Sequence, residues 1–145
     1  MAEVALPSPS GAHKGTTGFV SIRDAAILTA SYVATDHVNV GAYWSLALDI
    51  AFTLGSVTSC EIKMQYSNDG GTTWKDVLEE GSPTTGVYSP VLRSITFTAN
   101  AAGGLVYDVT PFELVRFAAD TTGGTVTGSS LALSVAAGLL GQDSL

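Results

Sequence analysis

The sequence is poor in positive charge and in chemically reactive side chains. Its 145 residues include six lysines and arginines, two histidines and one cysteine, and the formal net charge is −7. A single cysteine excludes a disulfide within the chain, and the strand-like surroundings of Cys60 predict a small buried side chain rather than a reactive thiol. Because the few basic residues nowhere cluster, the sequence argues against nucleic acid and anionic lipid as partners.

The motifs that catalysis and cofactor binding need are also missing. The chain contains no Gly-x-Ser-x-Gly elbow, no phosphate-binding loop and no Cys/His cluster suited to zinc. Asp69, Asp76, Glu79 and Glu80 could offer oxygen ligands to calcium, but their spacing matches no EF-hand loop and favours a solvated acidic loop. We therefore expect no enzymatic activity, no cofactor and no bound metal.

Targeting signals and long apolar runs are absent as well. Residues 1–10 have neither the basic nor the apolar region with which a signal peptide begins. The most apolar stretch, residues 131–140, is too short to span a bilayer. The expectation is a chain that is soluble when it is synthesised and has no membrane partner.

What the sequence does contain is an alternation of apolar and polar residues from position 19 onwards. Residues 46–54 and 60–66 place a large apolar side chain at every second position, which is typical of half-buried strands. The five residues between them, 55–59, are interpreted as a hairpin connection, and residues 23–29 could form one helical turn. Further strands are predicted at 18–22, 31–34, 91–98, 105–109, 114–118 and 130–137.

Short strands separated by Gly, Asn and Pro predict an all-β fold, namely a single antiparallel β-sandwich or a jelly-roll-like barrel. Residues 1–18 hold two prolines and three glycines and show no periodicity, so they are assigned to an extended N-terminal arm. The predicted organisation is therefore an arm over 1–18 and one β-sandwich domain over 19–145.

The sharpest local motif is YSNDGGTTW at residues 66–74. Asn-Asp-Gly-Gly between two alternating segments predicts a hairpin turn, in which Asp69 accepts backbone N–H groups, Gly71 takes a positive φ and Trp74 packs beneath. The pattern Ser67-x-Asp69-x-Gly71-x-x-Trp74 resembles the Asp-box of sialidases and other β-propellers, where it lies away from the chemistry. A propeller needs several copies and this chain has one. We interpret the four residues as a structural turn, with direct ligand contact as the alternative.

A wider resemblance covers residues 28–77, from LTASYVATDHVNVGAYWSLALDIAFTL to SCEIKMQYSNDGGTTWKDV. This stretch resembles small β-rich proteins encoded among the virion genes of tailed bacteriophages. The resemblance implies a non-enzymatic virion structural protein, and in particular a capsid decoration (cement) protein that stabilises the head shell through non-covalent contacts. It further implies synthesis in the host cytoplasm, a final place on the capsid surface, the major capsid protein or other virion subunits as partners, and a homo-oligomer such as a trimer.

Interface residues are expected where apolar side chains stand outside the domain pattern. These are the arm and the Ala-rich C-terminal strand with its tail, and deletion of residues 2–15 should weaken shell binding while leaving the fold intact. The candidate residues are Val4, Leu6, Pro7, Pro9, Leu139 and Leu140.

Two other functions fit the same sequence. One is a tail or neck accessory protein. The other is a carbohydrate-binding (receptor-binding) β-module in which Trp44 and Trp74 stack on sugar rings. The structural explanation of the same aromatic residues is that Trp74 covers the turn while Tyr43 or Trp44 fills the core.

Overall fold

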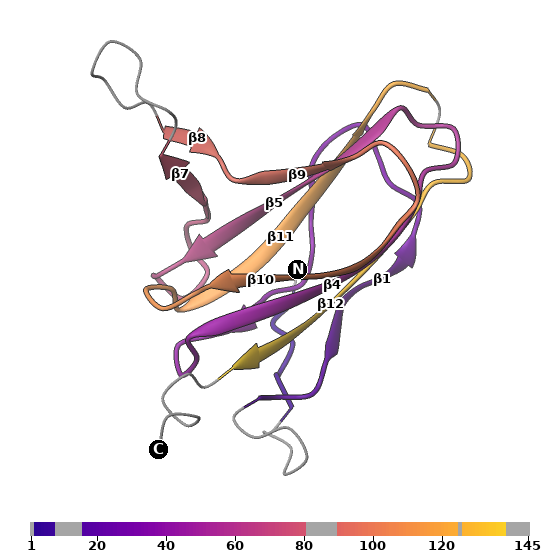
Figure 1. Ribbon diagram of the computed structural model, residues 1–145. Coiled ribbons are helices and arrows are strands. Elements are labelled where there is room, and N and C mark those ends of the chain that lie inside the picture. Colours follow the sequence, from indigo (N-terminus) through magenta and orange to yellow (C-terminus); the bar gives the residue numbers. More distant parts are fainter. Residues whose placement is uncertain (1, 8–15, 81–89, 125, 139–145) are drawn as a thin grey trace.

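A computed structural model describes residues 2–7, 16–80, 90–124 and 126–138. Within these residues the chain forms twelve strands joined by turns and irregular segments, and the paired strands run antiparallel (Figure 1). In chain order the strands are β1 (Val20–Ala26), β2 (Val33–Ala34), β3 (Val38–Asn39), β4 (Ser45–Thr53), β5 (Ser59–Ser67), β6 (Lys75–Asp76), β7 (Leu78–Glu80), β8 (Pro90–Leu92), β9 (Ser94–Phe97), β10 (Ala101–Asp108), β11 (Leu114–Thr122) and β12 (Ser130–Gly138).

The strands build two main sheets with the core between them. One sheet has the order β1-β12-β4-β10, and the other has β2-β11-β5-β6, with β3 also on β11 and β9 also on β5. The first strand thus pairs with the last, β2 and β3 with β11, β4 with β10, and β5 with β6 and β9. This nested series of antiparallel pairs is the wrapping of a jelly roll. The predicted all-β sandwich is confirmed.

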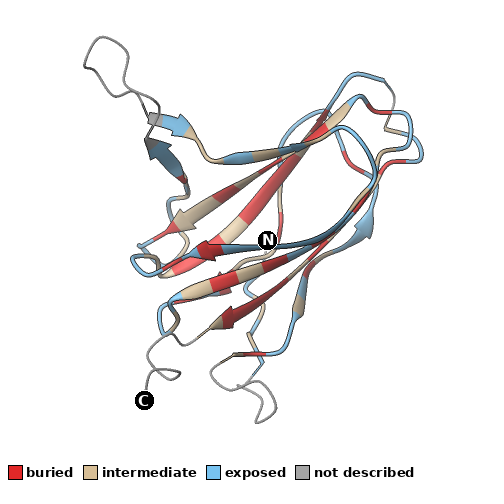
Figure 2. Ribbon diagram, viewed as in Figure 1, coloured by how far each residue is buried: buried red, intermediate tan, exposed pale blue. Residues whose placement is uncertain are grey.

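The alternation predicted from the sequence fills the core. On β4 the side chains of Leu46, Leu48, Ile50 and Phe52 are buried, whereas the residues between them are partly or fully exposed. Buried and more exposed residues also alternate along most of β5 and β12, whereas β11 is buried at most of its positions (Figure 2). Because apolar side chains face inwards from both sheets, their burial is the main force that holds the sheets together.

The expected hairpin at residues 55–59 is wrong. Strand β4 lies in one sheet and β5 in the other, so this connection crosses the end of the sandwich. Alternation shows which face of a strand is buried but not which strand pairs with it. Strands β4 and β5 both bury an apolar face, so the pattern alone could not place them in different sheets. The partners of β4 are β10 and β12, which are distant from it in the sequence.

The helical turn considered for residues 23–29 does not form either. Residues up to Ala26 belong to β1, whose pairing with β12 shifts register on both sides of Arg23. The guanidinium group of Arg23 donates hydrogen bonds to the carbonyl oxygens of Leu131, Ala26 and Ile27 at 3.0–3.2 Å. These bonds satisfy backbone acceptors that the irregular strand leaves unpaired.

The single strand predicted at 91–98 is divided in two. Strand β8 pairs with β7 in a small sheet that projects from the sandwich, whereas β9 pairs with β5 (Figure 1). At the break, the N–H of Arg93 donates to the carbonyl oxygen of Val77 at 3.0 Å.

Candidate binding surfaces

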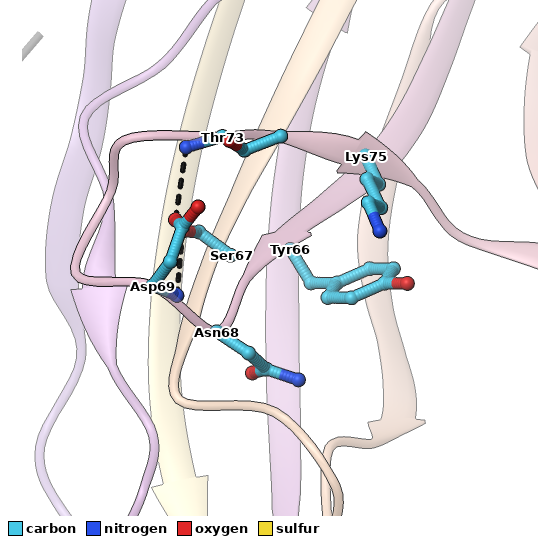
Figure 3. Close-up of a pocket in the computed structure, with 6 residues that line it drawn as sticks. All are labelled: Tyr66, Ser67, Asn68, Asp69, Thr73 and Lys75. Atoms are coloured by element: carbon cyan, nitrogen blue, oxygen red, sulfur yellow. Dashed lines mark hydrogen bonds between the residues drawn. The ribbon is translucent and has the colours of Figure 1, made fainter.

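Residues 67–73 form a turn in which Asp69 accepts a backbone N–H and Gly71 has a positive φ (Figure 3). Gly70 and Gly71 adopt φ angles of 74° and 92°. The N–H of Thr73 donates to Oδ1 of Asp69 at 2.9 Å, and the hydroxyl of Ser67 donates to the same oxygen at 2.7 Å. The N–H of Gly71 in turn donates to Oγ of Ser67 at 2.9 Å.

In these hydrogen bonds, polar groups of the turn have their partners within the same turn. Asn68 ties it to the next loop, because its side chain accepts from the N–H of Glu113 at 2.8 Å and donates to the carbonyl oxygen of Pro111 at 3.3 Å. Strands β5 and β6 pair through Gln65 with Asp76, so the turn closes a hairpin. The structural interpretation of the motif accounts for each of these contacts.

Acid is expected to weaken this turn. The hydrogen bonds from Thr73, and then from Ser67, lower the pKa of Asp69 from 3.8 to about 2. A carboxylate whose pKa is lower in the folded state stabilises that state above its unfolded pKa and loses the effect as the pH falls through the folded value. Between roughly pH 4 and pH 2 the melting temperature of the wild type should therefore fall more steeply than that of Asp69→Asn. Equal slopes in thermal melts followed by circular dichroism would contradict this prediction.

The ring of Trp74 packs against neighbouring side chains and is not a freely exposed surface for a ligand. The guanidinium carbon of Arg116 lies 4.2 Å from the centre of the ring, and the centre of the His37 ring lies 5.2 Å away. Trp44 differs, because 46% of it is exposed, while the adjacent Tyr43 packs against the core. The two tryptophans therefore have separate surroundings.

Trp44 lines a cleft of about 380 Å³ at the end of the β1-β12-β4-β10 sheet. Three further residues of the cleft, Val106, Tyr107 and Asp108, come from β10. Val106 is 71% exposed, and a carboxylate oxygen of Asp108 accepts from the N–H of Thr110 at 2.9 Å. An exposed aromatic ring beside a carboxylate can contact a sugar or the side chain of another protein.

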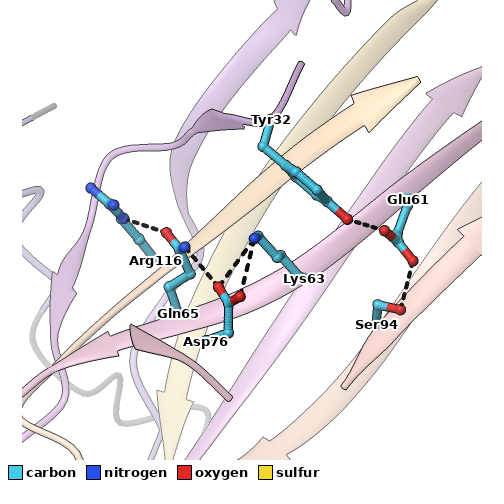
Figure 4. A network of polar contacts seen from close by, with 7 residues as sticks. All are labelled: Tyr32, Glu61, Lys63, Gln65, Asp76, Ser94 and Arg116. Carbon is cyan, nitrogen blue, oxygen red and sulfur yellow. Dashed lines mark hydrogen bonds and ion pairs between the residues drawn. The ribbon is translucent and has the colours of Figure 1, made fainter. Parts of the chain in front are cut away.

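The outer side of the β2-β11-β5-β6 sheet carries a network of polar side chains, which we call the polar face (Figure 4). On one half, Nζ of Lys63 lies 3.1 Å from Asp76, Gln65 donates to Asp76 at 2.8 Å, and Arg116 donates to Gln65 at 2.9 Å. On the other half, Tyr32 and Ser94 both donate to the carboxylate of Glu61. The residues of the polar face are Tyr32, Glu61, Lys63, Gln65, Asp76, Ser94 and Arg116.

The charges of the polar face balance one another. Burial raises the pKa of Asp76, but the hydrogen bonds from Gln65 and Lys63 and the charge of Lys63 outweigh it, so the pKa is lowered overall.

The calcium ligands considered from the sequence are not brought together, since Asp69 bonds within its turn and Asp76 bonds to Lys63 and Gln65. Among the residues that the structure describes, no group of three or more His, Cys, Asp or Glu side chains could hold a metal ion.

The outer side of the other sheet has a different composition and is here called the small-residue face. Strand register places Ala132, Ala51 and Ala102 in one row across β12, β4 and β10, and Ala136, Ala47 and Val106 in another. The outward positions of these three strands carry two charged residues, Asp49 and Asp108. A shallow hollow of about 500 Å³ lies over the first row. The members of the face are Ala47, Ala51, Ala102, Val106, Ala132 and Ala136, of which Ala136 is only 7% exposed.

The expected interface residues of the arm lie on the domain itself. The N–H of Val4 donates to the carbonyl oxygen of His37 at 2.7 Å, and Val4 and Leu6 pack against the core. Pro7 is exposed. Removal of these residues would cost packing as well as any docking function, so a deletion cannot separate the two.

The remaining candidates are Pro9 of the arm and the C-terminal strand with its tail. Pro9, Leu139 and Leu140 fall outside the described residues. The Ala-rich strand β12, expected at an interface, lies inside its sheet between β1 and β4, with Leu131 and Leu133 completely buried. Only the outward side of β12 can meet a partner, and this side belongs to the small-residue face.

Cys60 is buried, as its place in a strand predicts. Burial, and secondarily the charge of Asp120, raises the pKa of its thiol to about 11, although Arg23 acts in the opposite direction. Because the thiolate is the reactive form, this cysteine has low reactivity near neutral pH.

The described residues form no helix long and apolar enough to cross a membrane.

The sequence matches no family model and no curated protein. Among solved structures, the SPBc2 prophage-derived protein YomS has a similar fold, with a TM-score of 0.50 and 19% sequence identity over 83% of this chain and 90% of that chain. A CBM4 structure gives a TM-score of 0.45 and 9% identity over 86% and 71% of the two chains. A chain from the disulfide-linked pili of Bacillus endospore appendages gives 0.43 and 14% over 92% and 97%. The chain thus shares its all-β fold with a prophage-derived protein.

Proposed function

We propose that this protein is a structural component of a bacteriophage virion, and specifically a decoration protein that docks on the head shell. The surface proposed to meet the shell is the small-residue face. Its partners would then be the major capsid protein or other virion subunits, and its location the capsid surface. The proposed role is mechanical and needs no catalytic group.

The observation that carries the proposal is the contrast between the two outer faces of the sandwich. The polar face joins its charged side chains in a hydrogen-bonded network, whereas rows of alanine cross the small-residue face. Small side chains allow another surface to approach the sheet closely, and few charges have to lose their water. A protein that is bound on one side and exposed to solvent on the other needs two such faces.

The fold similarity to a prophage-derived protein is consistent with a phage origin. Many copies on a symmetric shell would each bury a modest area, and the array would add these contributions together.

Carbohydrate binding is the second candidate, because one specific site favours it. Trp44 is 46% exposed in a cleft with Asp108 and Thr110, and a sugar ring could stack there. A glycan titration that changes tryptophan fluorescence in the wild type but not in Trp44→Ala would favour this function over shell binding.

The decisive test places a second carboxylate beside Asp49 on the small-residue face, at Ala51 in the first row. Ala51 is exposed, so Ala51→Glu should fold normally while it introduces a carboxylate that close docking would have to desolvate. We expect this variant to lose most of its binding to phage heads prepared without the protein, measured by co-sedimentation. The control is Thr122→Glu, an exposed position at the end of β11, which should bind like the wild type.

Immunogold electron microscopy of virions gives the location independently. Gold distributed over the shell would support the proposal. Gold confined to the tail would contradict it and favour a tail or neck protein. Equal shell binding by the wild type and Ala51→Glu would show that another surface docks.

A further inference from the structure

The four edges of the two sheets are not equally protected. An edge strand with free N–H and C=O groups pairs readily with another chain, and proteins usually block such edges with irregularities, charge, short strands or a cover. At the β1 edge the pairing shifts register twice, and Arg23 occupies carbonyl oxygens there. This edge is therefore irregular and carries a charge.

Both edges of the β2-β11-β5-β6 sheet are interrupted. On one side β2 and β3 have two residues each, and the N-terminal segment covers the gap between them through hydrogen bonds of Ala2 and Val4 with His37. On the other side β6 and β9 are separate strands of two and four residues, and β6 consists of the charged pair Lys75 and Asp76.

Strand β10 has none of these protections within the part of the chain that the structure describes. Its eight residues pair with β4 without a shift, and β4 is its one strand partner among the described residues. From Ala101 to Val106 the strand has no charged residue and no proline, and Ala102 to Val106 are exposed. Figure 1 shows β10 at the border of its sheet.

An apolar cleft follows the same edge. It has a volume of about 210 Å³, and its walls come from both sheets. Ile95 and Phe97 of β9 form one side, while Ile50 and the 39% exposed Leu105 form the other. A strand added beside β10 would gain backbone hydrogen bonds, and its inward side chains would cover this cleft.

We propose that β10 pairs with β10 of a second copy, antiparallel about a twofold axis, so that two four-stranded sheets become one of eight strands. A twofold contact is self-complementary, so one unprotected edge is sufficient for it. In this pairing Leu105 of each copy reaches towards the cleft of the other.

Charge favours a second copy at this edge. The chain has a net charge of −7, and copies should avoid meeting where carboxylates face each other. Asp49 of β4 pairs with Gly104 and so lies one strand in from the edge. The edge strand itself is neutral from Ala101 to Val106, and its charged neighbours Glu79, Arg93 and Asp108 lie towards the Tyr107 end. Antiparallel pairing would place these groups of the two copies at opposite ends of the contact.

The contact is small, because a single strand pair buries less than the roughly 1,600 Å² of a standard stable interface. We expect a weak dimer in solution that is strengthened wherever copies are held side by side. This inference depends on the edge alone and goes beyond the shell proposal, so either can fail without the other. A trimer would need a different contact, since two paired edges leave neither free.

Sedimentation velocity over a concentration series tests the dimer. Val106→Lys adds a charge at a position that is 71% exposed, so it should leave the fold intact while raising the dissociation constant about tenfold or more. The matched control is Ile27→Lys, because Ile27 is 62% exposed and follows the protected β1 edge. This control should dimerise like the wild type.

Cysteine cross-linking tests the geometry. Ala102, Gly104 and Val106 are replaced by cysteine one at a time, and buried Cys60 can stay in place. At least one of the three variants should form a disulfide-linked dimer on mild oxidation, whereas Ile27→Cys should not. A wild type that stays monomeric at all concentrations, a trimer, or a dimer unaffected by Val106→Lys and not cross-linked through β10 would overturn the proposal.

Discussion

Truncation of Phe117 to alanine is expected to lower the free energy of unfolding by about 3–5 kcal/mol, the cost of removing a large aromatic side chain from a packed core. Phe117 is 1% exposed and is among the largest completely buried side chains. It lies on β11, and its ring centre is 5.5 Å from that of Tyr107 on β10, which belongs to the opposite sheet. The cavity would thus open between the two sheets, where neither can close it alone.

Urea unfolding followed by circular dichroism measures the loss. The control is Phe19→Ala, because Phe19 is 59% exposed and its truncation should change the stability by less than about 0.5 kcal/mol. A domain of this size is typically stable by about 5–15 kcal/mol, so the Phe117 variant should still fold but with a clearly lower midpoint. Similar midpoints for the two variants would show that the sheets do not pack through Phe117 as described.

Local features of this fold could be predicted from the sequence because neighbouring residues determine them. Alternating side chains revealed β4 and β5, and the Asn-Asp-Gly-Gly run gave the turn with its roles for Asp69 and Gly71. Strands β3 and β6 have two residues each, which is too short for a period of two to be visible.

The partners of each strand could not be predicted, because nested pairing joins segments that are far apart in the chain. The small-residue face shows this most clearly. The Ala-rich strand with Ala132 and Ala136 was expected at an interface, but the alanines at 47, 51 and 102 are unremarkable in the sequence, and strand register is what places all five in rows. The separate surroundings of Trp44 and Trp74 depend on the same long-range arrangement.

Gly55→Ala is the second substitution expected to be severely destabilising. Gly55 has a φ of 60°, which costs a residue with a Cβ about 1–2 kcal/mol. An added Cβ would also lie 2.4 Å from the carbonyl carbon of Gly128 and 2.5 Å from the nitrogen of Ser129. These are backbone atoms of the segment that leads into β12. The overlap should add about 1–3 kcal/mol, as overpacking does elsewhere.

The opposing segment has little room to retreat. Ser129 is 2% exposed, and its hydroxyl donates to the carbonyl oxygen of Val126 at 2.7 Å. Gly70→Ala is the matched control, because Gly70 has a φ of 74° but an added Cβ would meet nothing within 4 Å. The control should therefore lose only the backbone term, and the difference between the two variants in urea unfolding isolates the contact. If both variants lost the same stability, the backbone of residue 55 would lie farther from that of residue 128 than described. The connection between the sheets could then move to accept a Cβ without disturbing β12.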